Sequence, residues 1–418
     1  MKICIIGLGY VGLPLAIKLS QHYPTTGFDI DTARINELRT GHDRTLEISS
    51  ADLQHSTIDF TSKVSSINQH DVYIVTVPTP VTKKNTPDLG LLKKASQMLG
   101  RVISKNAIIV YESTVYPGVT EDFCGKIIEK TSGLVCGKDF FLGYSPERIN
   151  PGDKFHTIDK ITKVVAGQTP AVEDVLKEIY GKITKVFVAR NIKTAEAAKV
   201  IENTQRDINI AFMNELTQIF HADQISIYDV LKAAQTKWNF LSFTPGLVGG
   251  HCIGVDPYYL ASYAKKRKVS PRITLAGRYV NDQMAGFLAA QCHASLHKKK
   301  SSILVLGLTF KENVPDLRNT KIAPFIKHLE ALGHTIDVVD PLADPAEAFQ
   351  LYGLTLRSLE DLPKNHYDCI VGAVHHTSFS SLSSAALASL GKNPCCLFDV
   401  KNMWSQLEFP PHCHVASL

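Results

Sequence analysis

The chain has 418 residues, of which 44% are hydrophobic and 20% are charged, and its formal net charge is +5 at pH 7. This composition is typical of a soluble globular protein with room for two or three domains. The small positive charge suits an anionic small ligand and gives no reason to expect binding to nucleic acid.

Nine cysteines are scattered along the chain, and none has the paired spacing of a structural zinc site. We therefore expect free thiols in a reducing cytoplasm and no bound metal. No apolar run reaches about 18 residues, and the first residues read as a strand rather than as a leader peptide. We expect a cytoplasmic protein with no membrane partner.

A nucleotide-binding signature opens the chain. The apolar run of residues 2–6 predicts a buried parallel strand, and it leads directly into Gly7-Leu-Gly-Tyr-Val-Gly12 and a helical pattern. Such glycines allow a tight turn in which a pyrophosphate meets a helix N-terminus. The next strand ends at Asp29, near the expected position of the ribose-binding acid. A carboxylate there favours NAD over NADP, because it would repel a 2′-phosphate.

Further apolar strands are predicted at residues 71–77, 107–111 and 140–144. In an open α/β sheet the ligand binds at the carboxyl ends of such strands. The polar residues at these ends include Thr76, Ser113, Thr114 and Glu147. A loop hydroxyl such as that of Thr114 is also a common turn cap, so this position alone does not decide its role.

From about Thr194 the sequence is rich in helix formers and has apolar residues at three- and four-residue steps, which predicts a long helix. Lys199 and Asn203 lie one turn apart on one face of this helix. An ammonium and an amide in this arrangement can stabilise negative charge that develops on a substrate oxygen. A solvated surface lysine is the alternative interpretation.

The segment PGLVGGHCIGVDPYY, residues 245–259, combines a glycine pair with a thiol and a carboxylate. Gly249 and Gly250 permit a tight turn that approaches a ligand closely. Cys252 is a candidate nucleophile, and Asp256 follows it closely. A buried structural cysteine is the alternative, but Cys252 does not belong to a periodic apolar run.

A second α/β unit is expected towards the C-terminus, with strands at residues 302–307, 334–340, 367–374 and 396–400. No G-x-G-x-x-G motif follows its first strand, so we do not expect a second dinucleotide there. The predicted fold class is α/β, with two Rossmann-like domains with parallel sheets that are joined by a long central helix.

These motifs resemble those of the nucleotide-sugar 6-dehydrogenases, the UDP-glucose/GDP-mannose dehydrogenase superfamily. GGHCIGVDPYY is the most specific match, and its histidine before the cysteine resembles the branch that acts on UDP-N-acetylhexosamines. The resemblance implies an NAD-binding domain at 1–193, a central helical dimerisation region with the catalytic cysteine at 194–296, and a UDP-sugar-binding domain at 297–418.

The resemblance also implies roles for individual residues. Catalytic roles are expected for Thr114, Glu147, Lys199, Asn203, Cys252 and Asp256. Contacts with NAD are expected for Gly7, Gly9, Tyr10, Val11, Gly12, Asp29, Arg34, Thr76, Ser113 and Thr114. Contacts with the substrate are expected for Glu147, Arg148, Ile149, Asn150, Lys199, Asn203, Gly249, Lys311 and Arg318.

Two of these basic side chains allow more than one interpretation. Arg34 is equally consistent with a surface charge. Arg318 is equally consistent with a structural residue that holds its loop through Asp316. Lys401 is a further candidate for the uridine diphosphate end of the substrate.

The reaction implied is a two-step oxidation of C6 of UDP-N-acetylglucosamine or UDP-N-acetylgalactosamine to the uronic acid, for surface polysaccharide synthesis. Cys252 would carry a thiohemiacetal and then a thioester, which water placed by Glu147 and Asp256 would hydrolyse. The family further implies a homodimer in which one subunit donates a basic residue to the other. Candidates for that residue are Lys237, Arg272 and Arg278.

Other functions stay open at this point. The sugar could be that of UDP-glucose or UDP-N-acetylmannosamine. A one-step hydroxyacid dehydrogenase of the 6-phosphogluconate type would share the glycine loop and the long helix but would have no use for Cys252. A non-catalytic nucleotide-sugar sensor would not need the set Lys199, Asn203, Cys252 and Asp256.

Overall fold

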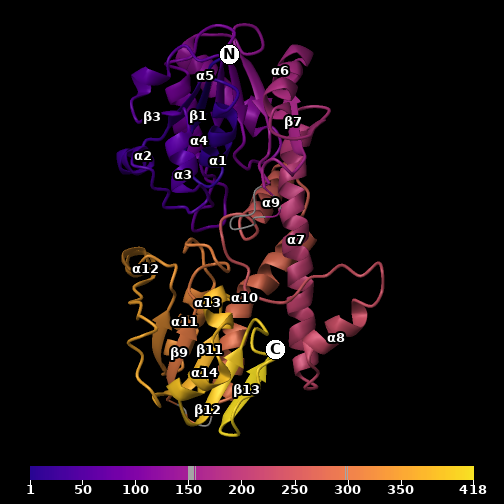
Figure 1. Ribbon diagram of the computed structural model, residues 1–418. Helices are drawn as coiled ribbons and strands as arrows, with labels where there is room; N and C mark the ends of the chain where they lie inside the picture. The colour runs from indigo at the N-terminus through magenta and orange to yellow at the C-terminus, as the bar shows by residue number, and fades with distance from the viewer. Residues whose placement is uncertain (149–154, 156, 297, 299) are drawn as a thin grey trace. The chain divides into compact units, whose positions relative to one another are not determined.

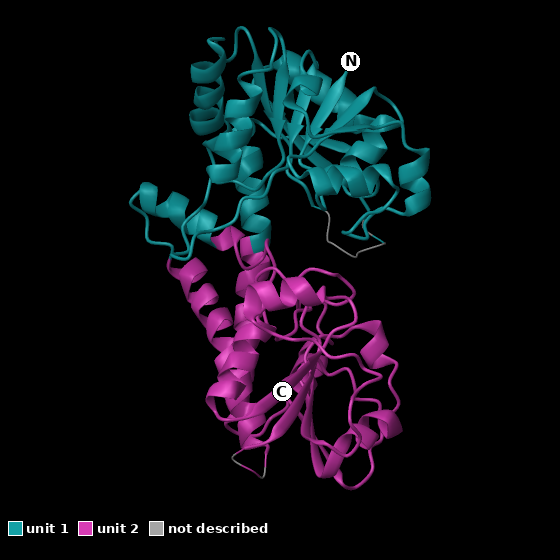
Figure 2. Ribbon diagram, turned by 90° about the vertical axis from the view of Figure 1, so that its left-hand side faces the viewer, with its two compact units in different colours: residues 1–203, 258–271 teal, residues 204–257, 272–418 magenta. Residues whose placement is uncertain are grey.

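The computed structural model describes residues 1–148, 155, 157–296, 298 and 300–418. These residues form two compact units, coloured separately in Figure 2, and each unit is described by itself. Unit 1 comprises residues 1–203 and 258–271, and unit 2 comprises residues 204–257 and 272–418. The division into three functional domains stays a prediction, because these two units reflect packing alone.

An eight-stranded sheet forms the centre of unit 1, in the order β3-β2-β1-β4-β5-β6-β7-β8. Figure 1 labels β1, β3 and β7 of this sheet. Its strands are β1 (Ile3–Ile6), β2 (Thr25–Phe28), β3 (Asp59–Thr61), β4 (Val72–Val75), β5 (Ile108–Tyr111), β6 (Phe141–Tyr144), β7 (Lys163–Gly167) and β8 (Val186–Val188). Neighbouring strands from β3 to β6 are parallel, but β7 is antiparallel to β6. The reversal brings the first residue of β7 to the carboxyl end of β6.

Both faces of the central strands β1, β4 and β5 are buried, which explains why these strands are apolar throughout. Ile3 and Ile5 of β1 belong to one core, whereas Cys4 and Ile6 belong to the other. The α-helices that lie wholly in unit 1 are α1 (Gly12–Ser20), α2 (Thr32–Arg39), α3 (Ser50–His55), α4 (Gly90–Leu99), α5 (Lys126–Ser132) and α6 (Pro170–Gly181). Helices α1, α2 and α6 contribute to the first core, and α4 and α5, with Ile192 and Ala195, contribute to the second.

The long helix predicted from about Thr194 is α7 (Ile192–His221), which has 30 residues. Its residues divide between the two units, and so do those of α9 (Asp256–Lys266). The helices that lie wholly in unit 2 are α8 (Ile227–Ala234), α10 (Arg272–Ala294), α11 (Ile322–Ala331), α12 (Pro345–Tyr352), α13 (Thr377–Ser380) and α14 (Ser384–Leu390).

Unit 2 is built on a five-stranded parallel sheet in the order β10-β9-β11-β12-β13. Its strands are β9 (Ser302–Leu306), β10 (Thr335–Val339), β11 (Tyr367–Gly372), β12 (Gly391–Asp399) and β13 (Cys413–Ser417). Helices α10 and α11 pack in one core, and α13 and α14 pack in the other. The predicted fold class is confirmed, although β13 and the reversed β7 were not predicted.

Candidate active site

The glycine loop between β1 and α1 is a tight turn. Gly7 has a φ of +97°, which would strain any side chain. A Cβ atom at Gly12 would lie 1.9 Å from the carbonyl oxygen of Gly7 and 2.5 Å from Thr76 Oγ1. Thr76 Oγ1 in turn donates a hydrogen bond to that carbonyl at 2.8 Å. Gly7 and Gly12 therefore allow the turn, and Thr76 holds it in place.

Gly9 differs from its neighbours, because no described atom would lie within 4 Å of a Cβ placed there. With Tyr10 and Val11 it leads into α1, which has no side-chain cap and no acidic residue in its first turn. The free N–H groups and the partial positive charge of such an N-terminus suit an anion. The loop therefore fits the pyrophosphate of a dinucleotide.

Asp29 follows β2 and is tied to the glycine loop. Its Oδ2 accepts a hydrogen bond from the backbone N–H of Leu8 at 2.8 Å, and its Oδ1 accepts one from Asp31 N at 3.0 Å. A carboxylate has about four lone-pair sites, so both oxygens can also accept from a ribose diol. The position of Asp29 therefore fits the adenosine ribose of NAD.

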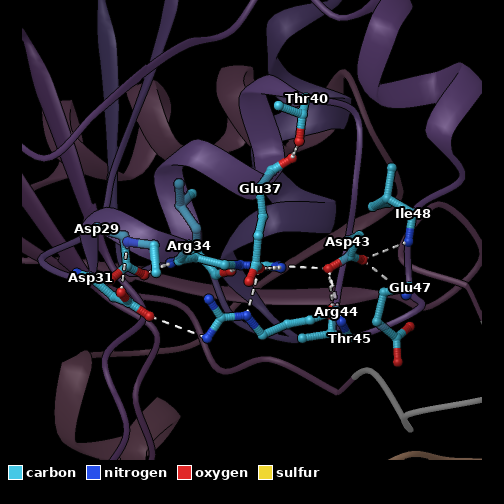
Figure 3. Close-up of polar contacts among 12 residues, drawn as sticks. Asp29, Asp31, Arg34, Glu37, Thr40, Asp43, Arg44, Thr45, Glu47 and Ile48 are labelled. Carbon is cyan, nitrogen blue, oxygen red and sulfur yellow. Dashed lines mark hydrogen bonds and ion pairs between the residues drawn. The ribbon is translucent and has the colours of Figure 1, made fainter.

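Arg34 is 4% exposed, which excludes the interpretation as a surface charge. Its Nε donates to the carbonyl of Leu8 at 3.0 Å, and its Nη2 donates to Asp43 Oδ1 at 2.6 Å (Figure 3). Its Nη1 is buried and has no hydrogen-bond partner among the described residues. Arg34 thus supports the glycine loop from within unit 1, and its Nη1 group makes no hydrogen bond to the described residues.

Asp43 is the centre of this cluster, although no pattern in the sequence singled it out. It accepts hydrogen bonds from Thr45 N and Oγ1 and from the backbone N–H groups of Glu47 and Ile48 (Figure 3). Burial raises the pKa of Asp43, but the hydrogen bonds from Thr45 and Arg34 outweigh it and hold the pKa below its usual value. Asp43 is therefore an ionised anchor for Arg34.

The loop after β5 carries the two predicted cofactor hydroxyls. Ser113 Oγ donates to the carbonyl of Val77 at 2.6 Å, and the carbonyl of Ser113 accepts from Tyr144 Oη at 3.2 Å. Thr114 follows and is half-buried. These bonds tie together the carboxyl ends of β4, β5 and β6, where the sequence predicts the ligand.

Glu147 and Lys199 meet within unit 1. Their exposed fractions are 6% and 8%, and Lys199 Nζ donates to the carbonyl oxygen of Glu147 at 2.9 Å. Arg148 joins the same loop to α7, since its Nη1 donates to the carbonyl of Lys199 at 3.3 Å and its Nη2 lies 2.7 Å from Glu202 Oε1. The loop after β6 is therefore fastened to the long helix.

Asn203 lies one turn beyond Lys199 on α7 and is 5% exposed. The solvated-lysine alternative is wrong, because both residues of the pair are buried. Ile149 and Asn150, which we expect to contact the sugar, lie outside the described residues.

Lys163 and Glu112 are buried charged residues that the sequence analysis missed. Lys163 Nζ lies 2.9 Å from Glu112 Oε2 and also contacts Glu147 Oε2. Tyr180 Oη donates to the other oxygen of Glu112 at 2.5 Å. A lysine directly before an apolar run is usually a solvated strand end, so the sequence held no signal for this burial.

In unit 2, Cys252 lies half-buried in a turn immediately before α9. Its carbonyl oxygen accepts hydrogen bonds from Val255 N at 3.0 Å and from Asp256 N at 2.8 Å. Asp256 begins α9 and is 2% exposed. Cys252 is therefore half-buried, whereas the carboxylate predicted to act near it is buried.

Gly249 and Gly250 are required by close packing against the loop after β9. A Cβ at Gly249 would lie 2.8 Å from the carbonyl oxygen of Asn319, and one at Gly250 would lie 2.7 Å from the ring of Phe310. Asn319 Nδ2 donates to the carbonyl of Gly250 at 3.0 Å. Protein therefore occupies the Cβ side of Gly249, and its predicted contact with the substrate has to come from the backbone.

His251 connects Cys252 to the loop after β9. Its Nδ1 lies 3.4 Å from Asp316 Oδ2. Burial lowers the pKa of His251, but the charge of Cys252 and the hydrogen bonds to Asp316 and Cys252 outweigh it and raise the pKa to about 9. Burial raises the pKa of Asp316, but hydrogen bonds from His251 and Arg318 bring it well below its usual value. An imidazolium therefore lies beside the thiol at neutral pH.

Arg318 holds its own loop, as the structural interpretation predicts. Its Nε lies 3.0 Å from Asp316 Oδ1, and its Nη2 lies 2.6 Å from Asp316 Oδ2. Nη2 also lies 3.3 Å from His251 Nδ1. Through Asp316, Arg318 therefore positions the histidine beside Cys252.

Lys311 and Lys401 lie together, although they are far apart in the sequence. Both line an open pocket of unit 2 with about 310 Å³ of empty volume, together with Lys321 and Phe310. Glu312 is the acidic residue of this lining. Lys321 Nζ pairs with Asp282 Oδ1 at 3.0 Å, and the positive charges of Lys311 and Lys401 suit an anionic ligand such as a diphosphate.

Arg278 is not available for donation to a partner subunit. It is 2% exposed, its Nη1 donates to Asp207 Oδ1, and its Nη2 donates to Asp282 Oδ1, each at 2.6 Å. Lys237 and Arg272 are exposed and remain candidates.

The start of the cysteine segment is anchored by Asn214 of α7, which the sequence analysis also missed. Asn214 Nδ2 donates to the carbonyl of Gly246 at 3.0 Å, and its Oδ1 accepts from Gly246 N at 2.8 Å. Asn281 Oδ1 accepts a further bond from Asn214 Nδ2 at 2.8 Å. The only sign of this role in the sequence is a polar asparagine at a buried position of the long helix.

Two further findings concern the described residues alone. They include no group of three His, Cys, Asp or Glu side chains arranged to hold a metal ion. They also include no helix with the length and apolarity needed to cross a bilayer.

Comparison with known families covers most of the chain. Models of the UDP-glucose/GDP-mannose dehydrogenase family match residues 1–184 with the NAD-binding domain, 193–283 with the central domain and 304–406 with the UDP-binding domain. The matches confirm the resemblance stated above and NAD as the cofactor.

Similar proteins agree with the family match. The chain is 48% identical to Protein CapL of Staphylococcus aureus and 46% identical to the UDP-N-acetyl-D-glucosamine 6-dehydrogenase of Pseudomonas aeruginosa, each over 96% of both chains. The solved structure of the UDP-D-ManNAc dehydrogenase from Pyrococcus horikoshii has a TM-score of 0.85 at 28% identity, with 99% of each chain covered. The chain therefore belongs to the UDP-glucose/GDP-mannose dehydrogenase family and is an NAD-dependent UDP-sugar dehydrogenase.

Proposed function

We propose that this enzyme oxidises C6 of a UDP-N-acetylhexosamine, UDP-N-acetylglucosamine or its galacto epimer, to the uronic acid for surface polysaccharide synthesis. The observation that carries the proposal is the half-buried Cys252 next to His251, whose pKa Cys252 and Asp316 raise. A neighbouring imidazolium favours the nucleophilic thiolate, which a one-step dehydrogenase does not need. The 46% identity to a UDP-N-acetyl-D-glucosamine 6-dehydrogenase supports the choice of sugar.

The first oxidation is assigned to groups of unit 1. Lys199, Asn203 and Thr114 would stabilise the negative charge that develops on the C6 oxygen as its proton leaves. The buried surroundings of Lys199 and Asn203 strengthen such an interaction, because the local dielectric is low. Bound NAD supplies the hydride acceptor, and two NAD molecules are used in turn for each acid formed.

The second oxidation requires a covalent intermediate. Cys252 adds to the aldehyde carbon, and the resulting thiohemiacetal loses the second hydride to become a thioester. Glu147 and Asp256 then place the water that hydrolyses it.

Substrate binding is assigned to the basic and polar residues that the family resemblance indicates. Lys311 and Lys401 would meet the diphosphate, because they line one cationic pocket. Arg148, Ile149, Asn150 and Gly249 would contact the sugar, the latter through its backbone. Arg318 contributes by holding Asp316 and His251.

The test counts NADH by absorbance and uronic acid by mass spectrometry, with a panel of UDP-sugars. We expect two NADH for each acid and much faster turnover of UDP-N-acetylglucosamine or UDP-N-acetylgalactosamine than of UDP-glucose. Cys252→Ala should form no acid while still binding NAD and UDP-sugar. One NADH per acid, or unchanged acid formation by Cys252→Ala, would show that the thioester route is wrong. A preference for UDP-N-acetylmannosamine or UDP-glucose would overturn only the choice of sugar.

A further inference from the structure

A buried cluster of unit 1 joins three neighbouring strands at the carboxyl edge of the sheet. Its members are Glu112, Glu147, Lys163 and Tyr180. The exposed fractions of the four residues are 3%, 6%, 4% and 1%. Lys163 Nζ lies between the two carboxylates, 2.9 Å from Glu112 Oε2 and in hydrogen-bond contact with Glu147 Oε2.

The reversed strand explains how the lysine reaches this place. Glu112 follows β5 and Glu147 follows β6, at the ends where a parallel sheet collects its ligand. Lys163 opens β7, and β7 runs antiparallel to β6. A parallel strand would have put its first residue at the opposite edge of the sheet.

The cluster places one ammonium group between two carboxylates. Burial alone would lower the pKa of Lys163, yet the charges of Glu112 and Glu147 outweigh it and raise that pKa. Burial also raises the pKa of Glu112, while the charge of Lys163 opposes this. Tyr180 Oη donates to Glu112 at 2.5 Å, which occupies the oxygen that Lys163 does not reach. Lys163 is therefore an ammonium group that is fixed by two carboxylates, those of Glu112 and Glu147.

Glu147 is gripped at three points. Its Oε2 accepts from Lys163, its Oε1 accepts from the backbone N–H of Arg148 at 2.5 Å, and its carbonyl accepts from Lys199 at 2.9 Å. A carboxylate that places a water for attack needs a fixed orientation, since misplacement by about 1 Å can cost about 100-fold in rate.

We propose that Lys163 is a positioning residue for thioester hydrolysis, which it serves by holding the Glu147 carboxylate against the ion pair with Glu112. This inference rests on the proposed function, in which Glu147 places the water. In that step water adds to the thioester carbonyl, a water proton passes to Glu147, and the C–S bond breaks to release the acid and the Cys252 thiolate. This hydrolysis consumes no oxidant and follows both hydride transfers. Loss of Lys163 therefore affects hydrolysis and not the hydride transfers.

The experiment is a comparison of Lys163→Met with wild type by rapid mixing and intact mass. We expect both hydrides to be transferred in the first turnover at near the wild-type rate. Steady-state turnover should fall about 100-fold, as for a misplaced group. The sugar–enzyme thioester should accumulate as a mass adduct on Cys252. Lys163→Arg, which keeps a cation, should recover most of the turnover and remove the adduct.

Two controls separate positioning from stability. Glu196→Gln changes another buried carboxylate of unit 1, which accepts hydrogen bonds from Gly118 N and Thr120 N. It should lower the melting temperature without any adduct. If Lys163→Met does not fold, the double variant Glu112→Gln/Lys163→Gln replaces it, because it removes the ammonium together with one carboxylate. This variant should also accumulate the adduct.

The outcomes are distinguishable from failure of the proposed function. Wild type that gives one NADH per acid, or that needs no Cys252, removes the proposed function itself. The role of Lys163 alone is overturned if wild type gives two NADH per acid but the folded Lys163 variants show no adduct. It is also overturned if these variants slow the first hydride transfer as much as they slow steady-state turnover.

Discussion

Asp29 sets the preference for NAD in our interpretation, because its carboxylate lies where a 2′-phosphate would be repelled. Both of its oxygens already accept one backbone hydrogen bond, so the side chain is held in place. We expect Asp29→Asn to reduce the ratio of kcat/KM for NAD to that for NADP by at least about 10-fold, since like-charge contact costs several kcal/mol. Steady-state kinetics with both cofactors measure this ratio. An unchanged ratio would contradict the assignment of Asp29 to the ribose.

His251 should make Cys252 reactive at neutral pH. The pKa of His251 is raised to about 9, so the imidazolium persists below that pH and is lost as the pH rises through it. We expect alkylation of Cys252 to be fast at pH 7. His251→Gln should slow it about 10-fold or more, because only a few per cent of a free cysteine is thiolate at that pH. The two rates should converge above about pH 9, where the histidine is neutral in wild type as well.

The measurement is the rate of iodoacetamide modification followed by intact mass, and bound UDP-sugar should slow it in both proteins. Asp316→Asn is the matched variant, because it keeps the histidine but removes the carboxylate that supports its charge. It should shift the profile in the same direction as His251→Gln, by a smaller amount. Superimposable profiles for all three proteins would contradict the role of the imidazolium.

At the scale of single residues, the sequence predicted those functional residues whose neighbours along the chain form a recognisable motif. The glycines, Asp29 and Cys252 belong to local motifs, so they could be singled out from the sequence, and their roles stay predictions. Arg34 was ambiguous because its partner Asp43 becomes a partner only through the fold. Lys163 was invisible for the same reason, since its charge is compensated by residues that precede it by 51 and 16 positions.

Two glycines of the same loop should respond differently to the same change. Gly12→Ala would force a Cβ to within 1.9 Å of the Gly7 carbonyl, so we expect it to destabilise the protein by about 1–3 kcal/mol. Gly9→Ala meets open space and should fold normally. Its methyl group would instead occupy the place of the pyrophosphate, and we expect the Kd for NAD to rise at least about 10-fold. Thermal unfolding and cofactor titration measure the two effects, and equal losses of stability would contradict this division.

The elements themselves were largely predictable, because buried parallel strands and a long amphipathic helix have clear periodic signatures. The strands β1, β4, β5 and β9 and the helix α7 appear within a few residues of their predicted positions. Strand direction has no such signature. The reversal of β7 depends on the long connection after β6, and most residues of β13 are exposed, so neither could be predicted from local pattern.

At the scale of the whole molecule, exposed apolar side chains on two helices of unit 2 favour self-association. Phe212 and Ile219 of α7 lie two turns apart and are 51% and 54% exposed, and Ile273 and Tyr279 of α10 are 72% and 68% exposed. Such side chains are commonly covered in an oligomer. We expect a homodimer by light scattering, and a monomer after Phe212→Glu with Ile219→Glu. Leu351→Glu, at an exposed position of α12, is the control that should stay dimeric, and a monomeric wild type would contradict the prediction.

The distribution of the thiols has a practical consequence. All nine cysteines are described, seven of them are buried, and Cys136 and Cys252 are half-buried. Burial raises the pKa of Cys136, whereas Cys252 lies beside a cation. A bulky fluorescent maleimide should therefore attach at a single place on the native chain. Fluorescence spectroscopy can use the unaltered protein as its own singly labelled sample, with the dye reporting from the nucleophile.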